Sequence, residues 1–209
     1  MRRMLYPYLI AMTLSISPAL AGPVSCYLEG TTGIGVSSTK LDGVGFAGSL
    51  DGLSSNGWLY APGIGCDMRV DKMVVGLMGR YDFGKLETSA SLGATSVDVH
   101  INRPWMVAAK LGMEVNPATV VYGVAGLTGA QLDLTALTGD KFNLKGKVIG
   151  GGVEWIISGP WSAKAEYTYS MFDKQNLYSL VDVTPNVHAM RVGFTYRFGG
   201  DIFGENASK

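Results

Sequence analysis

Residues 188–198 alternate between two kinds of side chain at every second position. One set is mostly aliphatic or aromatic and the other is small or charged: His188, Met190, Val192, Phe194, Tyr196 and Phe198 against Ala189, Arg191, Gly193, Thr195 and Arg197. Because successive side chains of a β-strand point to opposite faces, the pattern predicts a strand with one apolar and one polar face.

The same period of two recurs along the chain in eight segments. Each is about ten residues long, which is the length that a tilted strand needs to cross a bilayer. The segments are roughly 26–36, 57–68, 73–83, 103–114, 119–130, 144–156, 161–171 and 187–198. The pattern therefore predicts an all-β protein with eight antiparallel strands.

The connections between these segments alternate in length. Three are short (69–72, 115–118 and 157–160), and two of these contain Asn-Pro or Gly-Pro, which favour turns. The other four are longer and rich in Ser, Thr, Gly, Asp and Asn: 37–56, 84–102, 131–143 and 172–186. Short turns at one end and long loops at the other are typical of an up-and-down barrel in a bacterial outer membrane. With an even number of strands, both termini are expected in the periplasm.

The composition of the polar face decides which face meets the surroundings. A soluble sandwich or a lipocalin-like barrel needs a charged, hydrated outer face. Here the polar positions are mostly Gly, Ala, Ser and Thr, and only 16% of the residues are charged. We therefore predict that the apolar face contacts lipid and that the charges line a narrow lumen.

Aromatic residues cluster toward both ends of the predicted strands. Such girdles are expected where amphipathic rings meet lipid headgroups. The girdle at the short turns comprises Tyr27, Trp155, Trp161, Tyr196 and Phe198, and the one at the long loops comprises Trp58, Tyr60, Phe83, Trp105 and Tyr169.

The N-terminal residues have the pattern of a secretory signal peptide. Arg2 and Arg3 precede a short apolar run over 5–16, and an Ala-x-Ala motif ends at Ala21, so that Gly22 is expected to begin the mature chain. The predicted parts are a signal peptide (1–21), a barrel domain (22–198) and a polar tail (199–209). Without the signal, 15 basic residues face 17 acidic ones, a balance that does not favour nucleic acid as a partner.

Charged residues of both signs fall on the predicted inward face. They are Glu29, Arg80, Asp82, Lys110, Glu114, Glu154, Lys164, Glu166, Arg191 and Arg197. Isolated buried charges are costly, so we expect pairing, with Lys164 and Glu166 near Arg191, Arg197 and Glu154. The set forms either an ion pathway or a structural plug, and the narrow lumen of an eight-stranded barrel favours the plug.

Two cysteines remain after the predicted signal, Cys26 and Cys66. With a hairpin centred near residue 46, they lie opposite each other on the outward face, within reach of a disulfide. A one-residue shift in register would separate them. A lipoprotein anchor at Cys26 is the alternative, but the residues before it lack the usual Leu and small side chains.

Catalytic and metal-binding patterns are weak. His100 lies beside Asp98 in a long loop and His188 begins the last strand, so a dyad is conceivable, but no nucleophile motif such as G-x-S-x-G accompanies it. No metal-ligand cluster stands out. We predict a protein without cofactor that is not an enzyme.

Several stretches carry a resemblance to a known family. They are 27–30, 63–67 with 74–76, 121–126, 150–155, 163–167 and 191–198. In order and spacing they resemble the OmpA-like outer-membrane β-barrels, specifically the small opacity-protein and porin-like group common in alphaproteobacteria. In such barrels a terminal Phe resembles the signal read by the barrel-assembly machinery, a role that falls here on Tyr196 and Phe198. This chain departs from the pattern because it continues to Lys209.

These observations predict a structural, surface-exposed protein of the outer membrane of a Gram-negative bacterium. Its expected partners are outer-membrane lipid and lipopolysaccharide, the barrel-assembly machinery, and a host or environmental ligand at the four loops. A narrow porin-like channel for small solutes is the alternative, and an outer-membrane enzyme is a third hypothesis.

Overall fold

The computed structural model describes residues 24–43, 50–92, 95–134, 141–173, 175–177 and 181–199, and side chains over 24–38, 56–84, 104–131, 143–173 and 185–198. The predicted signal peptide, with Ala21 and Gly22, and the tail after Gly199 lie outside these ranges. The strands are β1 (Val24–Gly43), β2 (Leu50–Val70), β3 (Met73–Tyr81), β4 (Lys85–Leu92), β5 (Thr95–Asn116), β6 (Thr119–Leu134), β7 (Lys141–Ser158), β8 (Trp161–Phe172), β9 (Gln175–Leu177) and β10 (Val181–Gly199). No helix among these residues is long and apolar enough to cross a membrane.

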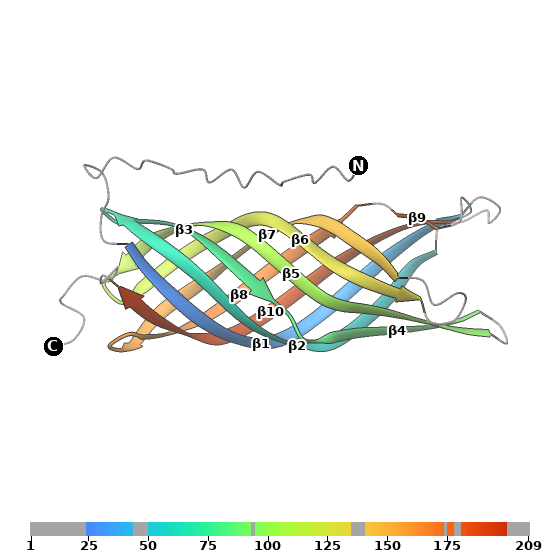
Figure 1. Ribbon diagram of the computed structural model, residues 1–209, viewed down its shortest axis with the longest axis horizontal. Helices are drawn as coiled ribbons and strands as arrows, with labels where there is room; N and C mark the ends of the chain where they lie inside the picture. Colours follow the sequence, from blue (N-terminus) through green and yellow to red (C-terminus); the bar gives the residue numbers. More distant parts are fainter. Residues whose placement is uncertain are drawn as a thin grey trace, which may run out of the picture.

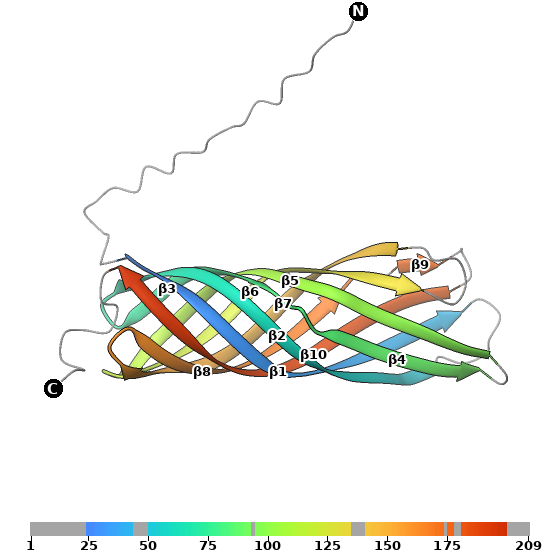
Figure 2. The ribbon, with the colours of Figure 1, turned by 60° about the horizontal axis from the view of Figure 1, so that its bottom comes forward.

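The strands form one closed sheet (Figures 1 and 2). β1 pairs antiparallel with β2 along one edge and with β10 along the other, so the first and last strands meet. β4 continues β3 after residues 82–84, and the short β9 follows β8 and pairs with β10. The predicted eight-stranded antiparallel barrel is therefore confirmed.

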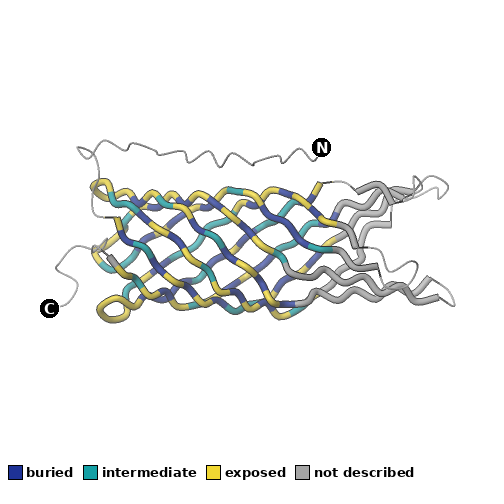
Figure 3. The backbone as a smooth tube through the Cα atoms, in the orientation of Figure 1, coloured by how far each residue is buried: buried dark blue, intermediate teal, exposed yellow. Residues whose placement is uncertain are grey.

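Buried and exposed residues alternate along the strands wherever their side chains are described, which gives the banded tube of Figure 3. Outward side chains such as Leu77 and Phe83 are 65% and 66% exposed, whereas inward charges such as Lys110 and Glu154 are 3% and 2% exposed. The barrel wall is therefore apolar on its outer face and ionic on its inner face. Exposing so much apolar surface is favourable only if lipid surrounds the barrel.

Tyr27 was assigned to the lipid-facing aromatic girdle at the short turns, but its side chain lies on the inward face of β1. Tyr27 is 1% exposed and points into the lumen, in step with the buried Glu29 two positions later. Trp155, Trp161, Tyr196 and Phe198 do point outward, and the Trp161 and Tyr196 rings meet edge to face at 5.0 Å. The assignment of Tyr27 to the lipid-facing girdle was therefore wrong, because the alternation of the strand outweighs closeness to its end.

The long connections contain much more strand than predicted. β1 and β10 stay paired from Ser25 with Gly199 to Gly43 with Val181, and β4 pairs with β5 over the whole of Lys85–Leu92. Most of the residues predicted as loops in 37–56 and 84–102 are thus extensions of the barrel wall. The three short connections are tight turns at 71–72, 117–118 and 159–160, with Gly159 supplying a positive φ of 52°.

One interruption of the barrel wall lies between β2 and the segment formed by β3 and β4. β2 and β3 pair from Val70 to Gly63, but beyond this point only Asn56 of β2 pairs with β4. Pro62 is the first residue past the paired stretch. The amide of Phe83 donates to the Tyr60 carbonyl, so the main-chain polar groups of Tyr60 face this side, as does the nitrogen of Pro62 two residues later. The missing N–H of Pro62 therefore points toward β3, just beyond the last residue pair of the β2–β3 ladder.

Candidate functional site in the lumen

Four charged side chains meet near the middle of the lumen, and we call them the central set. Arg80 of β3 contacts Glu29 of β1 (Nε–Oε1, 3.0 Å) and Glu166 of β8 (Nη2–Oε1, 2.5 Å). Lys164 of β8 contacts Glu29 (Nζ–Oε2, 2.6 Å) and Glu166 (Nζ–Oε2, 3.3 Å). Two acids thus face two bases, and three of the four contacts join strands that are not neighbours, while Lys164 and Glu166 both lie on β8.

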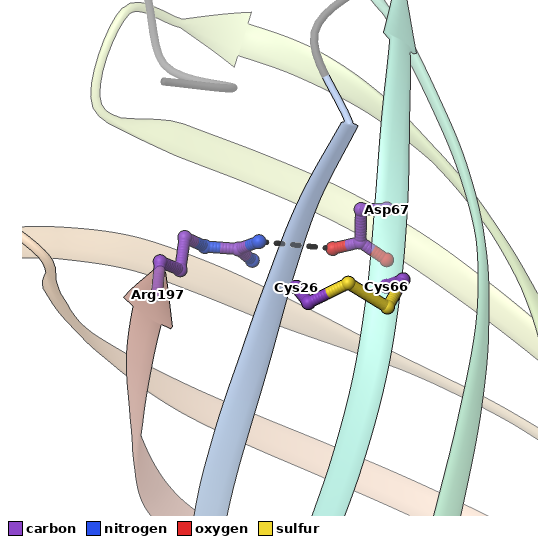
Figure 4. The surroundings of a disulfide bond; sticks show 4 residues. All are labelled: Cys26, Cys66, Asp67 and Arg197. Atoms are coloured by element: carbon purple, nitrogen blue, oxygen red, sulfur yellow. Dashed lines mark hydrogen bonds and ion pairs between the residues drawn. A yellow bond between two sulfur atoms is a disulfide. The ribbon is translucent and has the colours of Figure 1, made fainter. Parts of the chain in front are cut away.

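Four further charges form a second neutral group nearer the short turns, the short-turn set. Lys110 lies 3.0 Å from both Asp67 and Glu154. Arg197 contacts the same two acids, at 3.1 Å and 2.5 Å, and Ser162 donates a hydrogen bond to Glu154. Figure 4 shows the Arg197–Asp67 pair reaching from β10 across β1 to β2.

The rings of two tyrosines, Tyr122 and Tyr27, lie against the cations of the two charged sets. The Tyr122 hydroxyl donates to Glu166 at 2.9 Å, and its ring lies 4.7 Å from the Lys110 nitrogen and 5.6 Å from that of Lys164. The Tyr27 ring lies 5.0 Å from the Arg197 guanidinium. An aromatic face attracts a desolvated cation, so the rings stabilise the ammonium and guanidinium groups that the acids already pair.

Toward the long connections the lumen becomes apolar. Arg191 of β10 pairs with Asp82 (3.1 Å) and donates to the Thr168 hydroxyl (2.9 Å). Beyond this pair lies an apolar cluster that we call the upper cluster: Leu59, Ala130, Leu144, Phe172 and Ala189. A cavity of about 30 Å³ lies between Arg191 and this cluster. It holds one or two waters at most.

Nine of the ten charges predicted to face inward take part in these contacts. The tenth, Glu114, pairs with Arg69 close to the short turns, apart from both sets. Lys164 and Glu166 pair with Glu29 and Arg80, in place of the predicted Arg191, Arg197 and Glu154. Asp67, 1% exposed, was missed by the sequence analysis, although the alternation that turns Cys66 outward also turns Asp67 inward.

The one histidine side chain that the structure describes, His188, does not point into the lumen. His188 lies on the outer surface, where its Nδ1 is 2.6 Å from the Tyr167 hydroxyl and its ring is 4.5 Å from that of Tyr169. The side chains of His100 and Asp98 lie outside the described residues. Within the described part of the chain, no three His, Cys, Asp or Glu side chains are grouped so that they could hold a metal ion.

Cys26 and Cys66 form a disulfide between β1 and β2, with their Cα atoms 3.9 Å apart (Figure 4). Cys26 pairs in register with Cys66, and both side chains lie on the outward face. The bond therefore sits on the lipid side of the wall, directly behind the Arg197–Asp67 pair of the lumen.

A closed antiparallel barrel with a lipid-facing apolar belt and an ionic lumen defines an integral outer-membrane protein. Comparison with known proteins gives the family: the chain belongs to the outer membrane protein β-barrel domain family, whose model matches residues 8–198. The small OmpA-like outer-membrane barrel expected from the sequence is thereby confirmed.

The chain is similar to the 31 kDa outer-membrane immunogenic protein of Brucella melitensis, with 27% identity over 177 residues that cover 76% of this chain and 73% of that protein. Among solved structures, OprG from Pseudomonas aeruginosa shares 15% identity and a TM-score of 0.51 over 86% of this chain and 98% of that one. AlkL in lipid bilayers shares 10% identity and a TM-score of 0.51 over 95% and 98%. These two likenesses concern the fold.

Proposed function

We propose that this protein is a non-enzymatic, non-conducting barrel of the outer membrane that presents its long-connection end to the surroundings. The observation that carries the proposal is the pairing of the charges that line the lumen. Among the described side chains, five buried acids are paired with four buried bases and the half-buried Arg197: Glu29, Asp67, Asp82, Glu154 and Glu166 with Arg80, Lys110, Lys164, Arg191 and Arg197.

Paired charges of this kind favour a plug over an ion pathway. An ion that enters must displace a partner from a desolvated ion pair. Breaking a buried ion pair costs about 3–5 kcal/mol. The upper cluster adds an apolar barrier on the other side of Asp82 and Arg191. The same pairing leaves none of these carboxylates available as a general base, which supports a role other than catalysis.

The proposed orientation places the three tight turns in the periplasm and the long connections outside. Short periplasmic turns and long outer connections are the general layout of bacterial outer-membrane barrels. A host or environmental ligand would then meet the long-connection end, as would neighbouring lipopolysaccharide.

Two lysines on β7 support contact with anionic lipid at that end. Along the outward face of β7, Ile149 is followed by Lys147 and Lys145, both exposed. Among the side chains that the structure describes, these and Asp173 are the exposed charges beyond the apolar belt at the long-connection end. Lysines at this level reach lipid phosphates, each worth about 1 kcal/mol near an anionic surface.

Planar bilayer recording with refolded mature protein tests the sealed lumen. We expect no stepwise conductance. The sensitivity control is a variant in which the central set becomes Glu29→Ser, Arg80→Ser, Lys164→Ser and Glu166→Ser, without change in net charge, and Leu59→Ala and Phe172→Ala thin the upper cluster. This variant is expected to conduct. A reproducible open channel from the unchanged protein would support the alternative, a narrow porin-like channel.

A further inference from the structure

A groove of about 540 Å³ crosses the outer surface of the barrel from β2 over β1, β10 and β8 to β7. Its floor is low because Gly30 of β1 and Ala163 of β8 occupy outward positions. A Cβ added at Gly30 would meet no atom within 4 Å, so the space above this residue is open. Larger exposed side chains border the groove: Tyr60, Trp155, Val192 and Phe194.

The register of the strands explains this hollow. One row across the wall pairs, from β2 to β7, Pro62, Gly30, Phe194, Ala163 and Trp155. The next outward row toward the short turns contains large exposed side chains, Ile64, Leu28, Tyr196 and Trp161. The row with two small residues therefore lies lower than the row beside it.

The groove lies near the middle of the lipid-facing belt. Gly30 is six residues from the start of β1, which is about 20 Å along the strand and about 15 Å in depth at a tilt of about 40°. A hydrocarbon core is about 30 Å thick, so a lipid whose headgroup lies at the short turns reaches this depth with its acyl chains. Trp161 and Tyr196 lie between the groove and the short turns, where amphipathic rings meet headgroups.

The chemistry of the groove fits hydrocarbon. It is continuous with the surface that already contacts lipid, and its exposed borders carry no charge, since Lys164 beneath the floor points into the lumen toward Glu29 and Glu166. Wall atoms that face an unfilled hollow lose dispersion contacts. A flexible acyl chain recovers these contacts by bending around Phe194, whereas the rigid wall of a second barrel would need a matching ridge.

We propose that the groove holds one acyl chain of a phospholipid from the leaflet at the short turns, so that this lipid stays with the barrel while its neighbours exchange. The chain packs over Gly30 between Tyr60 and Phe194, and the headgroup lies at the level of Trp161 and Tyr196. The choice of phospholipid rests on the proposed orientation, which places lipopolysaccharide at the long-connection end. The filling of the groove by an acyl chain does not depend on that orientation or on whether the lumen conducts.

Native mass spectrometry tests the proposal by counting the lipids that stay on each barrel. Mature protein is refolded in detergent micelles with palmitoyl-oleoyl phosphatidylethanolamine and then released from the micelle in the gas phase. We expect the unchanged protein to retain one lipid. Gly30→Leu fills the open space and is expected to lower the lipid-bound fraction about fivefold or more. The matched control is Gly123→Leu on β6, outside the groove, where an added Cβ has its nearest neighbour at 3.7 Å. This control is expected to retain the lipid.

A second variant keeps the result independent of strain at position 30. Tyr60→Ala/Phe194→Ala lowers the borders of the groove without adding volume and is also expected to reduce retention, and a heat-modifiable band shows that each variant is folded. No retained phospholipid on the unchanged protein, or equal retention by Gly30→Leu and Gly123→Leu, would overturn the proposal. Dimers that Gly30→Leu converts to monomers, without bound lipid, would overturn it in favour of a second copy in the groove. Lipid A retained in preference to phosphatidylethanolamine, when both are offered, would overturn the choice of phospholipid.

Discussion

The β1–β2 pair is joined to the rest of the barrel by two seams, one with β10 and one with β3, and these seams are built differently. Where the chain closes on itself, β1 and β10 pair over 19 consecutive residues without a shift in register. Two strands further round, β2 and β3 pair over eight residues, and beyond Pro62 one residue pair with β4 remains. The closing seam between β1 and β10 joins the two ends of the sequence and is continuous. The seam between β2 and β3, which are neighbours in the chain, is the one that is interrupted.

Ion pairs in the lumen hold the broken seam from inside. Arg80, in the last part of β3, reaches past β2 to Glu29 on β1 and across to Glu166 on β8. Asp82, just after β3, is held by Arg191 on β10. Lumen ion pairs thus join the end of β3 to β1, β8 and β10 at the point where its hydrogen-bonded ladder with β2 stops.

Removing Arg80 is expected to have the largest effect. Arg80→Met leaves Glu29 and Glu166 buried with Lys164 as the one cation of the central set, and unpaired buried charge costs about 3–5 kcal/mol. Urea unfolding in lipid vesicles, followed by tryptophan fluorescence, measures the free energy of unfolding. Lys72→Met in the exposed turn 71–72 is the control and is expected to change it by less than about 0.5 kcal/mol. A loss below about 1 kcal/mol for Arg80→Met would mean that the ladder alone keeps the seam closed.

The Asp82–Arg191 pair should show strong coupling. Asp82→Leu strands the Arg191 guanidinium, which retains Thr168, and is expected to cost about 2–4 kcal/mol. In the double variant Asp82→Leu/Arg191→Leu the loss should be smaller than the sum of the single losses, with a coupling energy of about 1.5–3 kcal/mol in a double-mutant cycle. Additive losses would argue against a direct clamp on the end of β3.

Two glycines of β1 test how tightly the closing seam is packed. A Cβ on Gly33 would meet the backbone of Met190 and Arg191 on β10, whereas a Cβ on Gly30 meets nothing within 4 Å. Gly33→Ala is therefore expected to destabilise the barrel by about 1–3 kcal/mol, and Gly30→Ala, the matched control on the same strand, by less than about 0.5 kcal/mol. Equal unfolding midpoints for the two variants would show that the seam yields easily.

Restoring the backbone donor at position 62 should have the smallest effect on stability. Pro62→Ala adds an N–H facing β3 but also frees the unfolded chain, so the two contributions nearly cancel and the free energy of unfolding changes by less than about 1 kcal/mol. Hydrogen exchange should nevertheless slow at Tyr81 and Phe83 as the β2–β3 ladder lengthens. Unchanged exchange at both residues would place the cause of the interruption elsewhere than in Pro62.

The sequence was sufficient to predict the barrel and the side of the wall on which most charges lie. The alternation in 188–198 and the small residues on the polar face carry that information locally. The partners of each charge were not predictable, because Arg80 and Glu29 meet across a lumen whose geometry depends on the tilt and stagger of all strands. Asp67 was within reach of the same alternation, and Tyr27 was misplaced because its distance from the strand end was weighed above its parity.

The extent of the strands was not predictable for a different reason. Outside the bilayer nothing requires one face to be apolar, so the alternation that marks a strand fades while the hydrogen-bonded ladder continues. Residues 37–43 and 95–102 belong to β1 and β5 for this reason, although their composition is typical of loops.

The length of β5 determines how far the protein reaches from the membrane. Its 22 residues span about 70 Å, while a hydrocarbon core of about 30 Å takes about 40 Å of a strand tilted by about 40°. About 30 Å of paired strand is left over, which raises a stiff collar roughly 20 Å above the lipid on the proposed orientation. A visiting molecule would touch that collar well before it came near the acyl chains.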